Sequence, residues 1–369
     1  MDTHRGRVPV VNDVTPVFPQ AGIDYPADLA EFRVWFPSDG ACLDYLEWLR
    51  WPNGFVCPHC NADSAGRDSL ARYRCHGCRK QVSVTSGTMF HRSRVPLTVW
   101  FEAAWLMSVS KSGVTAAHLH RVLPISSYQT VWAMLAKFRQ VMAPSRSALL
   151  SGRVEVDETL IGGPRTGAPG RGAAGKTLVA GAIEVTDQGW GRARLAVIPD
   201  ASAVSLREFI TTCIAPGATV VTDGWTSYPS ALEGYEHEPI NISASGQPAH
   251  ESLPAVHRLF ALTKRLLEGT YQGGGSAEHL GEYLDEFVFR FNRRHSRSRG
   301  LVFMRLLQRT TADQAVTYRQ LVRIPQAKQV HPSGVTGARS RPGSLDIGAR
   351  DRPWRQSKTR SQSGQQIVT

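Results

Sequence analysis

The fold is decided by a short alternating stretch, Arg153-Val154-Glu155-Val156-Asp157-Glu158. Valine recurs at every second residue, which predicts a β-strand with its valines on one face. Residues 161–175 are rich in glycine and read as a loop. Apolar runs at Thr177–Val185 and Ala193–Ile198 predict two further strands. Three strands joined by loops indicate an antiparallel set.

The next elements place two aspartates. Helices are predicted at Ser205–Cys213 and Trp225–Leu232, with a buried strand at Thr219–Asp223 between them, so an α/β layer with a mixed sheet is expected. Asp157 ends the first strand and Asp223 the fourth, and their carboxylates meet at one sheet edge if these strands are neighbours. Facing carboxylates repel unless a cation such as Mg²⁺ lies between them, an arrangement suited to phosphodiester chemistry. Two solvated strand-end aspartates are the alternative.

Four of the six cysteines form two pairs, Cys57-Pro-His-Cys60 and Cys75-His-Gly-Cys78, with fourteen residues between them. This spacing suits a tetrahedral zinc site, whereas a cytosolic compartment disfavours two disulfides. We therefore predict a zinc ribbon in which Zn²⁺ supplies the folding energy that so small a module lacks. The expected ligands are Cys57, Cys60, Cys75 and Cys78. A short strand is expected at Gln81–Val84.

A helical segment follows the ribbon. Apolar residues at helical spacing predict helices at Leu97–Val109, Ala117–Leu123 and Thr130–Met142. Polar residues open the last helix, as in a helix-turn-helix unit that reads a DNA groove, so Gln129 and Thr130 are candidate DNA contacts. An ordinary three-helix packing unit is the alternative.

The charge balance favours a polyanionic partner. The chain has 43 Lys and Arg against 31 Asp and Glu, a net charge of +12. Residues 326–369 carry eight basic and two acidic residues among Gly, Ser, Pro and Gln, which predicts a disordered basic tail. No apolar run approaches the ~18–20 residues of a membrane span, and the N-terminus lacks a signal pattern. We therefore expect neither secretion nor membrane insertion, and no membrane partner.

Four motifs occur in a characteristic order. They are Val154–Thr159, Val221–Trp225, His257–Phe260 with Lys264, and Tyr283–Arg294. Together they resemble the bacterial insertion-sequence transposases that have an N-terminal zinc ribbon and an RNase H-like DDE-type catalytic domain. The resemblance covers about residues 36–299. It implies a multidomain chain with a zinc ribbon, a helix-turn-helix-like helical segment and an α/β RNase H-like catalytic domain with a mixed sheet.

The resemblance also implies site residues. Asp157 and Asp223 match the two catalytic aspartates, and His257 takes the third position, which varies in the family. Lys264 follows seven residues later, so both side chains project from one helix face. His257 would complete the metal site, and Lys264 would hold a DNA phosphate. Imidazole is a softer ligand than carboxylate, which leaves Mg²⁺ and Mn²⁺ both open. Glu251 is the nearby acidic rival of His257.

Further polar residues near these motifs have open roles. Glu155 and Glu158 are expected to support Asp157 rather than bind metal, and Trp225 is expected to pack. The arginines after the helix Leu280–Phe291 either contact phosphates or form a solvated helix end. Glu286 is expected to pair with these arginines, which are Arg293, Arg294, Arg297 and Arg299, the first two being candidate DNA contacts.

The resemblance implies the function of a DNA transposase, a cytoplasmic protein that is associated with the bacterial nucleoid in use. It would bind the terminal repeats of its element, cleave 3′ ends with a divalent metal and transfer them to target DNA, as a homodimer or larger assembly on double-stranded DNA. There are two alternatives. One is a catalytically silent domesticated transposase that acts as a zinc-ribbon DNA-binding regulator, and the other is a different RNase H-like nuclease such as a resolvase.

The expected domains are a poorly ordered arm (1–35), zinc ribbon with preceding helix (36–90), helical DNA-binding segment (91–150), RNase H-like catalytic domain (151–300), C-terminal helical extension (301–325) and disordered basic tail (326–369).

Overall fold

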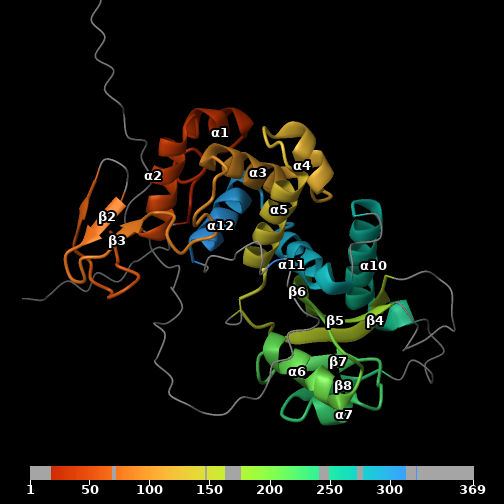
Figure 1. The fold of residues 1–369 in the computed structure, drawn as a ribbon. Coiled ribbons are helices and arrows are strands. Elements are labelled where there is room, and N and C mark those ends of the chain that lie inside the picture. The colour runs from red at the N-terminus through yellow and green to blue at the C-terminus, as the bar shows by residue number, and fades with distance from the viewer. Residues whose placement is uncertain are drawn as a thin grey trace, which may run out of the picture.

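The computed structural model describes residues 18–68, 72–145, 148–162, 176–240, 249–271, 277–312 and 321. Figure 1 shows a helical part, with the small ribbon sheet attached, above a larger sheet that has helices on both faces. The predicted basic tail, the first 17 residues and most of the glycine-rich loop lie outside the described residues.

The helical part is built around one aromatic core. Its rings include Phe32, Trp105 and Phe303, whose centroids lie about 5 Å apart in pairs, at 4.9 Å for Phe32–Trp105 and 5.5 Å for Trp105–Phe303. The helices that contribute are α1 (Leu29–Trp35), α2 (Asp39–Arg50), α3 (Leu97–Val109), α4 (Ala116–Val122), α5 (Tyr128–Met142) and α12 (Arg299–Ala312). The three helices predicted after the ribbon are confirmed as α3, α4 and α5.

Two expected segments differ from the structure. Residues 1–35 were expected to form a poorly ordered arm, but Leu29–Trp35 is helix α1, because Phe32 and Trp35 are buried in the aromatic core and Asp28 caps the helix. The helix expected as a C-terminal extension begins at Arg299 and returns to the helical part, where α12 lies among α2, α3 and α5 (Figure 1). The first and last described helices are therefore partners in one core.

The larger sheet is mixed, as predicted. Its strand order is β6-β5-β4-β7-β8, and β4 lies at the centre. The first three strands pair antiparallel, whereas β4 pairs parallel with β7 and β7 with β8. The bounds are β4 (Arg153–Ile161), β5 (Thr177–Thr186), β6 (Gly189–Val197), β7 (Thr219–Thr222) and β8 (Glu236–Pro239), the last of which the sequence did not indicate.

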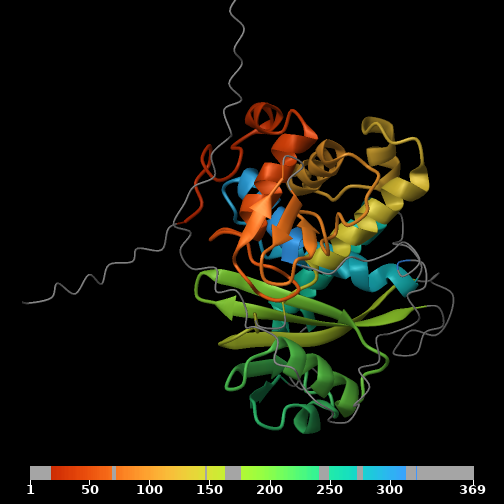
Figure 2. The ribbon, with the colours of Figure 1, turned by 60° about the vertical axis from the view of Figure 1, so that its left-hand side comes forward.

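Helices cover both faces of this sheet (Figure 2). On one face, Val154 and Val156 of β4 pack with α6 (Ala203–Cys213) and α7 (Tyr228–Ala231), which confirms that the valines share a face. The other face is covered by α10 (Pro254–Gly269) and α11 (Leu280–Phe291), which follow the short helices α9 (Ala249–Ser252) and η1 (Ala277–His279). Helix α7 is shorter than predicted, because Asp223 and Gly224 form a turn before it, with Gly224 at φ +76°.

A buried ion pair connects the helical part to the sheet. Arg139 of α5 donates from Nε to Glu286 Oε2 of α11 at 2.9 Å, and Tyr271 donates to the other oxygen of Glu286 at 2.9 Å. The guanidinium also lies 4.2 Å from the ring centroid of Tyr283. Both charged side chains are almost fully buried. Glu286 was expected to pair with the arginines that follow α11, and this expectation is wrong, since its partner comes from a helix 147 residues upstream.

Removing one partner of this pair tests its structural role. Glu286→Leu should lower the free energy of unfolding by about 3–5 kcal/mol, because Arg139 would keep a buried charge without its counter-ion. Urea denaturation measures the difference. The exposed Glu102 of α3 gives the control, since Glu102→Gln should change stability by at most about 0.5 kcal/mol. Equal stability of the two variants would contradict the role assigned to the pair.

Candidate functional site

The two predicted aspartates lie at the same edge of the sheet. β4 and β7 are parallel neighbours, and Glu155 pairs with Val221 in their register. Counting two residues on from this pair brings Asp157 and Asp223 to matching positions on adjacent strands. Asp157 is buried within β4, whereas Asp223 follows β7 directly and accepts a hydrogen bond from the backbone N–H of Trp225 at 3.0 Å. The strands that carry or precede the two aspartates are therefore neighbours, which is the condition under which we expected the carboxylates to meet.

A buried tyrosine joins this acidic edge. The hydroxyl of Tyr228 donates to Glu158 Oε1 at 2.7 Å. Burial, followed by the charges of Glu158, Asp157 and Asp223, raises the pKa of Tyr228 well above its ordinary value. The hydroxyl is therefore a fixed donor within the field of three carboxylates. No sequence motif pointed to Tyr228, although its place five residues after Asp223 was a usable signal.

Helix α10 brings the predicted third residue to Asp157. His257 Nε2 lies 3.5 Å from Asp157 Oδ2. Two turns later, Lys264 donates from Nζ to Thr159 Oγ1 of β4 at 2.7 Å. Burial lowers the pKa of Lys264, which is half-buried. Both residues thus face β4 from one side of α10, as the spacing of seven residues predicts. Glu251, the acidic rival, is exposed on α9.

Glu155 holds the start of the same helix. Its buried carboxylate accepts hydrogen bonds from the backbone N–H groups of Ala255 at 2.8 Å and Val256 at 2.9 Å. Burial raises the pKa of Glu155, and the two backbone hydrogen bonds oppose this rise. The carboxylate faces a helix N-terminus, where negative charge is stabilised by the unpaired N–H groups and the helix dipole.

The donor set at this edge has the chemistry of a divalent-cation site. Adjacent oxygen ligands of an octahedral cation with bonds of about 2.1 Å lie about 3 Å apart. The 3.5 Å between Asp157 Oδ2 and His257 Nε2 is close to that spacing. Within the part of the chain that the structure describes, however, the four cysteines are the one tight cluster of three or more potential ligand residues. Asp157, Asp223 and His257 therefore stay a predicted ligand set.

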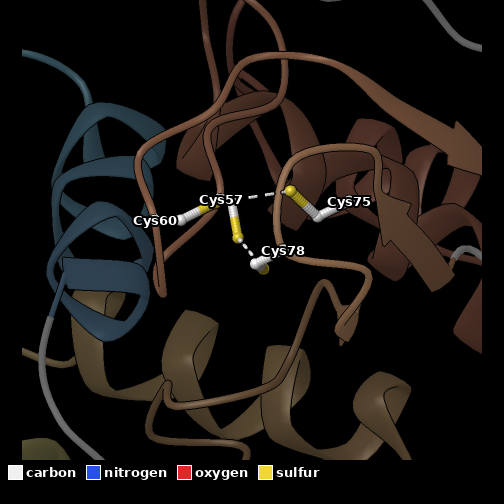
Figure 3. A group of neighbouring side chains, drawn as sticks. All are labelled: Cys57, Cys60, Cys75 and Cys78. Carbon is white, nitrogen blue, oxygen red and sulfur yellow. Dashed lines mark hydrogen bonds between the residues drawn. The ribbon is translucent and has the colours of Figure 1, made fainter.

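The four cysteines of the ribbon converge as predicted (Figure 3). Their sulfur atoms all lie within 4.8 Å of one another, with Cys57–Cys78 at 3.7 Å and Cys60–Cys75 at 3.5 Å. Sulfur ligands of a tetrahedral zinc with bonds of about 2.3 Å are about 3.8 Å apart, whereas disulfide sulfurs are about 2.05 Å apart. The arrangement fits a structural zinc site, and the thiols are not paired as disulfides.

The backbone of the ribbon is shaped for thiolates. It folds as a three-stranded sheet of β1 (Ala65–Arg67), β2 (Arg72–Cys75) and β3 (Gln81–Ser83). Each cysteine pair is followed by a residue in the left-handed region, Asn61 at φ 59° and Arg79 at φ 62°. The backbone N–H of Cys78 is the main cause that lowers the pKa of the Cys75 thiol, to about 7. At Cys75 the second knuckle thus favours the charged form of sulfur that binds zinc.

The candidate DNA contacts of the helical segment lie at the start of α5. Ser127 caps this helix, and Thr115 caps α4. Gln129 is exposed and accepts a hydrogen bond from the Ser127 hydroxyl at 3.1 Å, while Thr130 is half-buried. α4 and α5 are consecutive helices joined by a short connection, and a helix-turn-helix unit that reads DNA stays a prediction.

The other two candidate DNA contacts, Arg293 and Arg294, make their contacts with other residues of the protein. The guanidinium of Arg293 lies 3.8 Å from the centroid of Phe289, and burial lowers its pKa to about 10. Arg294 lies over Phe291 at 4.0 Å and donates to the carbonyl oxygens of Gly191 and Trp190. These contacts stabilise the end of α11 against β6.

Trp225, which was expected to pack, is 38 % exposed beside Asp223.

Comparison with known proteins gives the same picture as the geometry. Residues 149–292, which include the acidic edge and α10, match the family model of the ISXO2-like transposase domain, and residues 37–81 match the transposase zinc-ribbon domain. The chain belongs to the insertion-sequence transposases with an N-terminal zinc ribbon. A 209-residue stretch is also 26 % identical to an "uncharacterized protein in transposable element ISH50" of Halobacterium salinarum, over 52 % of this chain and 70 % of that protein. In the described part of this transposase, no helix is long and apolar enough to span a membrane.

Zinc removal tests the ribbon of the transposase. Purified protein should contain one zinc per chain, and Cys75→Ser should lose it, because three thiolates and a hydroxyl hold zinc much more weakly. The ribbon should then become sensitive to proteolysis, since it has little apolar core of its own. Atomic absorption and limited proteolysis measure both effects. Cys213, a buried cysteine outside the ribbon, gives the control, since Cys213→Ala should keep its zinc. Full zinc content in the Cys75 variant would remove that residue from the site.

Proposed function

We propose that this chain is an active DNA transposase with an RNase H-like catalytic core. The observation that carries the proposal is the arrangement at the carboxyl edge of the sheet. Asp157 and Asp223 occupy matching positions on adjacent parallel strands, and His257 lies against Asp157. The strand order β6-β5-β4-β7-β8, with three antiparallel strands followed by two parallel ones, supports the RNase H-like assignment.

In this mechanism Asp157, Asp223 and His257 would hold Mg²⁺ or Mn²⁺ at the edge of the sheet. When bound, such a cation polarises the scissile phosphate, activates a water and stabilises the leaving 3′-oxygen. Tyr228 keeps Glu158 engaged through its hydrogen bond, so that this neighbouring carboxylate is turned to the protein. Lys264 of α10 donates a hydrogen bond to Thr159, which lies on β4 two residues after Asp157. This bond would hold the ammonium group in place to bind a DNA phosphate.

The DNA itself would be bound by the ribbon and the helical part. Exposed polar groups at the start of α5, and the exposed basic residues Arg74, Arg79 and Lys80 of the ribbon, would supply contacts to the DNA phosphates. The freed 3′-hydroxyl would attack target DNA in strand transfer. Joining two element ends requires two catalytic sites, so we propose a homodimer or larger assembly on DNA.

Cleavage of DNA that carries the terminal repeats of the element tests the proposal. Wild type should nick the 3′ ends in the presence of Mg²⁺ or Mn²⁺ and join them to a target plasmid. Asp157→Asn and Asp223→Asn should each reduce cleavage by more than about 10²-fold, the scale found when groups that stabilise transition-state charge are removed. Both variants should bind the same DNA with unchanged affinity in a band-shift assay.

Glu251→Gln is the matched control, because this acidic residue is near α10 but exposed. It should cleave at the wild-type rate, whereas a loss equal to that of the aspartate variants would make Glu251 the third ligand. If wild type binds the repeats and does not cut under any metal, the chain is the non-catalytic DNA-binding regulator.

The histidine ligand makes a separate prediction about metal preference. Imidazole suits Mn²⁺ better than Mg²⁺, so the ratio of cleavage rates in Mn²⁺ and Mg²⁺ should be well above one for wild type. His257→Glu should lower this ratio, because a carboxylate restores an oxygen ligand. His257→Ala should reduce cleavage in both metals. An unchanged ratio in His257→Glu would exclude the imidazole from the metal site.

A further inference from the structure

We propose that Glu155 is a positioning residue that sets the place of His257 by anchoring the N-terminus of α10 to β4. The inference rests on the proposed metal-dependent function, and it concerns a residue that lies outside the ligand set. The sequence suggested only that Glu155 supports Asp157. The structure shows that its carboxylate contacts the helix that carries His257.

The anchor replaces a cap that α10 does not have. Leu253, at the N-cap position, makes no side-chain cap hydrogen bond, and Pro254, the first helical residue, has no N–H. The next two N–H groups, of Ala255 and Val256, have no partner within the helix. Glu155 Oε2 accepts both of them, and its side chain is 6 % exposed. The residue that follows these two is His257, so the carboxylate fixes the backbone directly before it.

Three alternate residues of β4 contact α10 in order. Glu155 accepts from Ala255 and Val256, Asp157 lies next to His257, and Thr159 accepts from Lys264. Residues 155–159 of a strand span about 13 Å at ~3.3 Å per residue. Residues 256–264 of a helix span about 12 Å at ~1.5 Å per residue. The two lengths are similar, and the contacts of Glu155 and Thr159 with α10 lie on either side of the Asp157–His257 contact.

A glycine allows the close approach that this arrangement needs. Gly181 of β5 pairs directly with Asp157 across the strands. The ring of Phe260, one turn after His257, lies over Gly181, and a Cβ there would collide with this buried ring. α10 is therefore held from one end by Glu155 and seated against the sheet beside Asp157. A change at either place would move His257 relative to Asp157.

The test measures Mn²⁺ binding to the zinc-loaded protein by titration calorimetry, together with the melting temperature. Glu155→Gln keeps the size of the side chain but loses its charge, and Glu155→Ala removes the anchor. Both should weaken Mn²⁺ binding, the second by about 10-fold or more, as is typical for residues that orient a metal ligand. In the His257→Ala background, Glu155→Ala should cause no further loss, because there is no imidazole left to position.

Ser202→Ala is the matched control. It removes the N-cap of α6 at the same sheet and should lower the melting temperature without affecting Mn²⁺ binding. If Glu155→Gln and Glu155→Ala behave like this control, or if their effect persists in full without His257, Glu155 is only a structural residue and the inference is wrong. If wild type binds no Mn²⁺ and cleaves no DNA, the proposed function fails, and the inference fails with it.

If Glu155→Ala does not fold, Gly181→Ala gives an independent way to displace α10. It should weaken Mn²⁺ binding when His257 is present and cause no further loss in the His257→Ala background.

Discussion

The alternation of β4 is the constraint on which the rest of the structure depends. Its even-numbered valines are buried against α6 and α7, while Glu155, Asp157 and Thr159 face α10. A shift of one residue would exchange the faces, placing the valines under α10 and two carboxylates in the apolar core. Nine residue pairs with β5 and a parallel pairing with β7 hold the register. The position of the acidic edge is therefore a consequence of strand pairing at the centre of the sheet.

Four carboxylates, those of Glu155, Asp157, Glu158 and Asp223, lie on or beside β4. Placing them so close together is unfavourable unless each accepts a hydrogen bond. The structure gives each a different donor: two backbone N–H groups for Glu155, the Tyr228 hydroxyl for Glu158, the Trp225 N–H for Asp223, and the N–H of Glu158 for Asp157. Since the donors come from several elements, the acidic cluster also ties those elements together. Polar groups of this kind, costly in a core of apolar side chains, are found where a site uses them.

Local patterns in the sequence predicted more of this molecule than long-range ones. The cysteine spacing, the helices after the ribbon and the shared face of the β4 valines each depend on a few neighbouring residues, and the structure has them as predicted. The expectation that Asp157 ends its strand is wrong, since β4 continues to Ile161 by pairing with β5, whereas Asp223 does follow the end of β7. The partner of Glu286, the return of α12 to the core of α1 and the anchor at α10 each join residues at least 100 positions apart. No periodicity carries that information, because it depends on how finished elements pack.

The contacts between the two parts of the molecule have a consequence for its action on DNA. Arg290 of α11 donates to the carbonyl oxygens of Met107 and Ser110 at the end of α3, and Thr270, just after α10, donates to Ser112 O in the turn before α4. With the Arg139–Glu286 pair, these bonds fix the helical part against α10 and α11, the two helices that cover one face of the sheet. Separating the two parts would break the buried ion pair and these three hydrogen bonds together, so the chain holds α4 and α5 in one position relative to the sheet. If these two helices bind DNA, as proposed, the distance between that DNA and Asp157 is set by the fold of the chain.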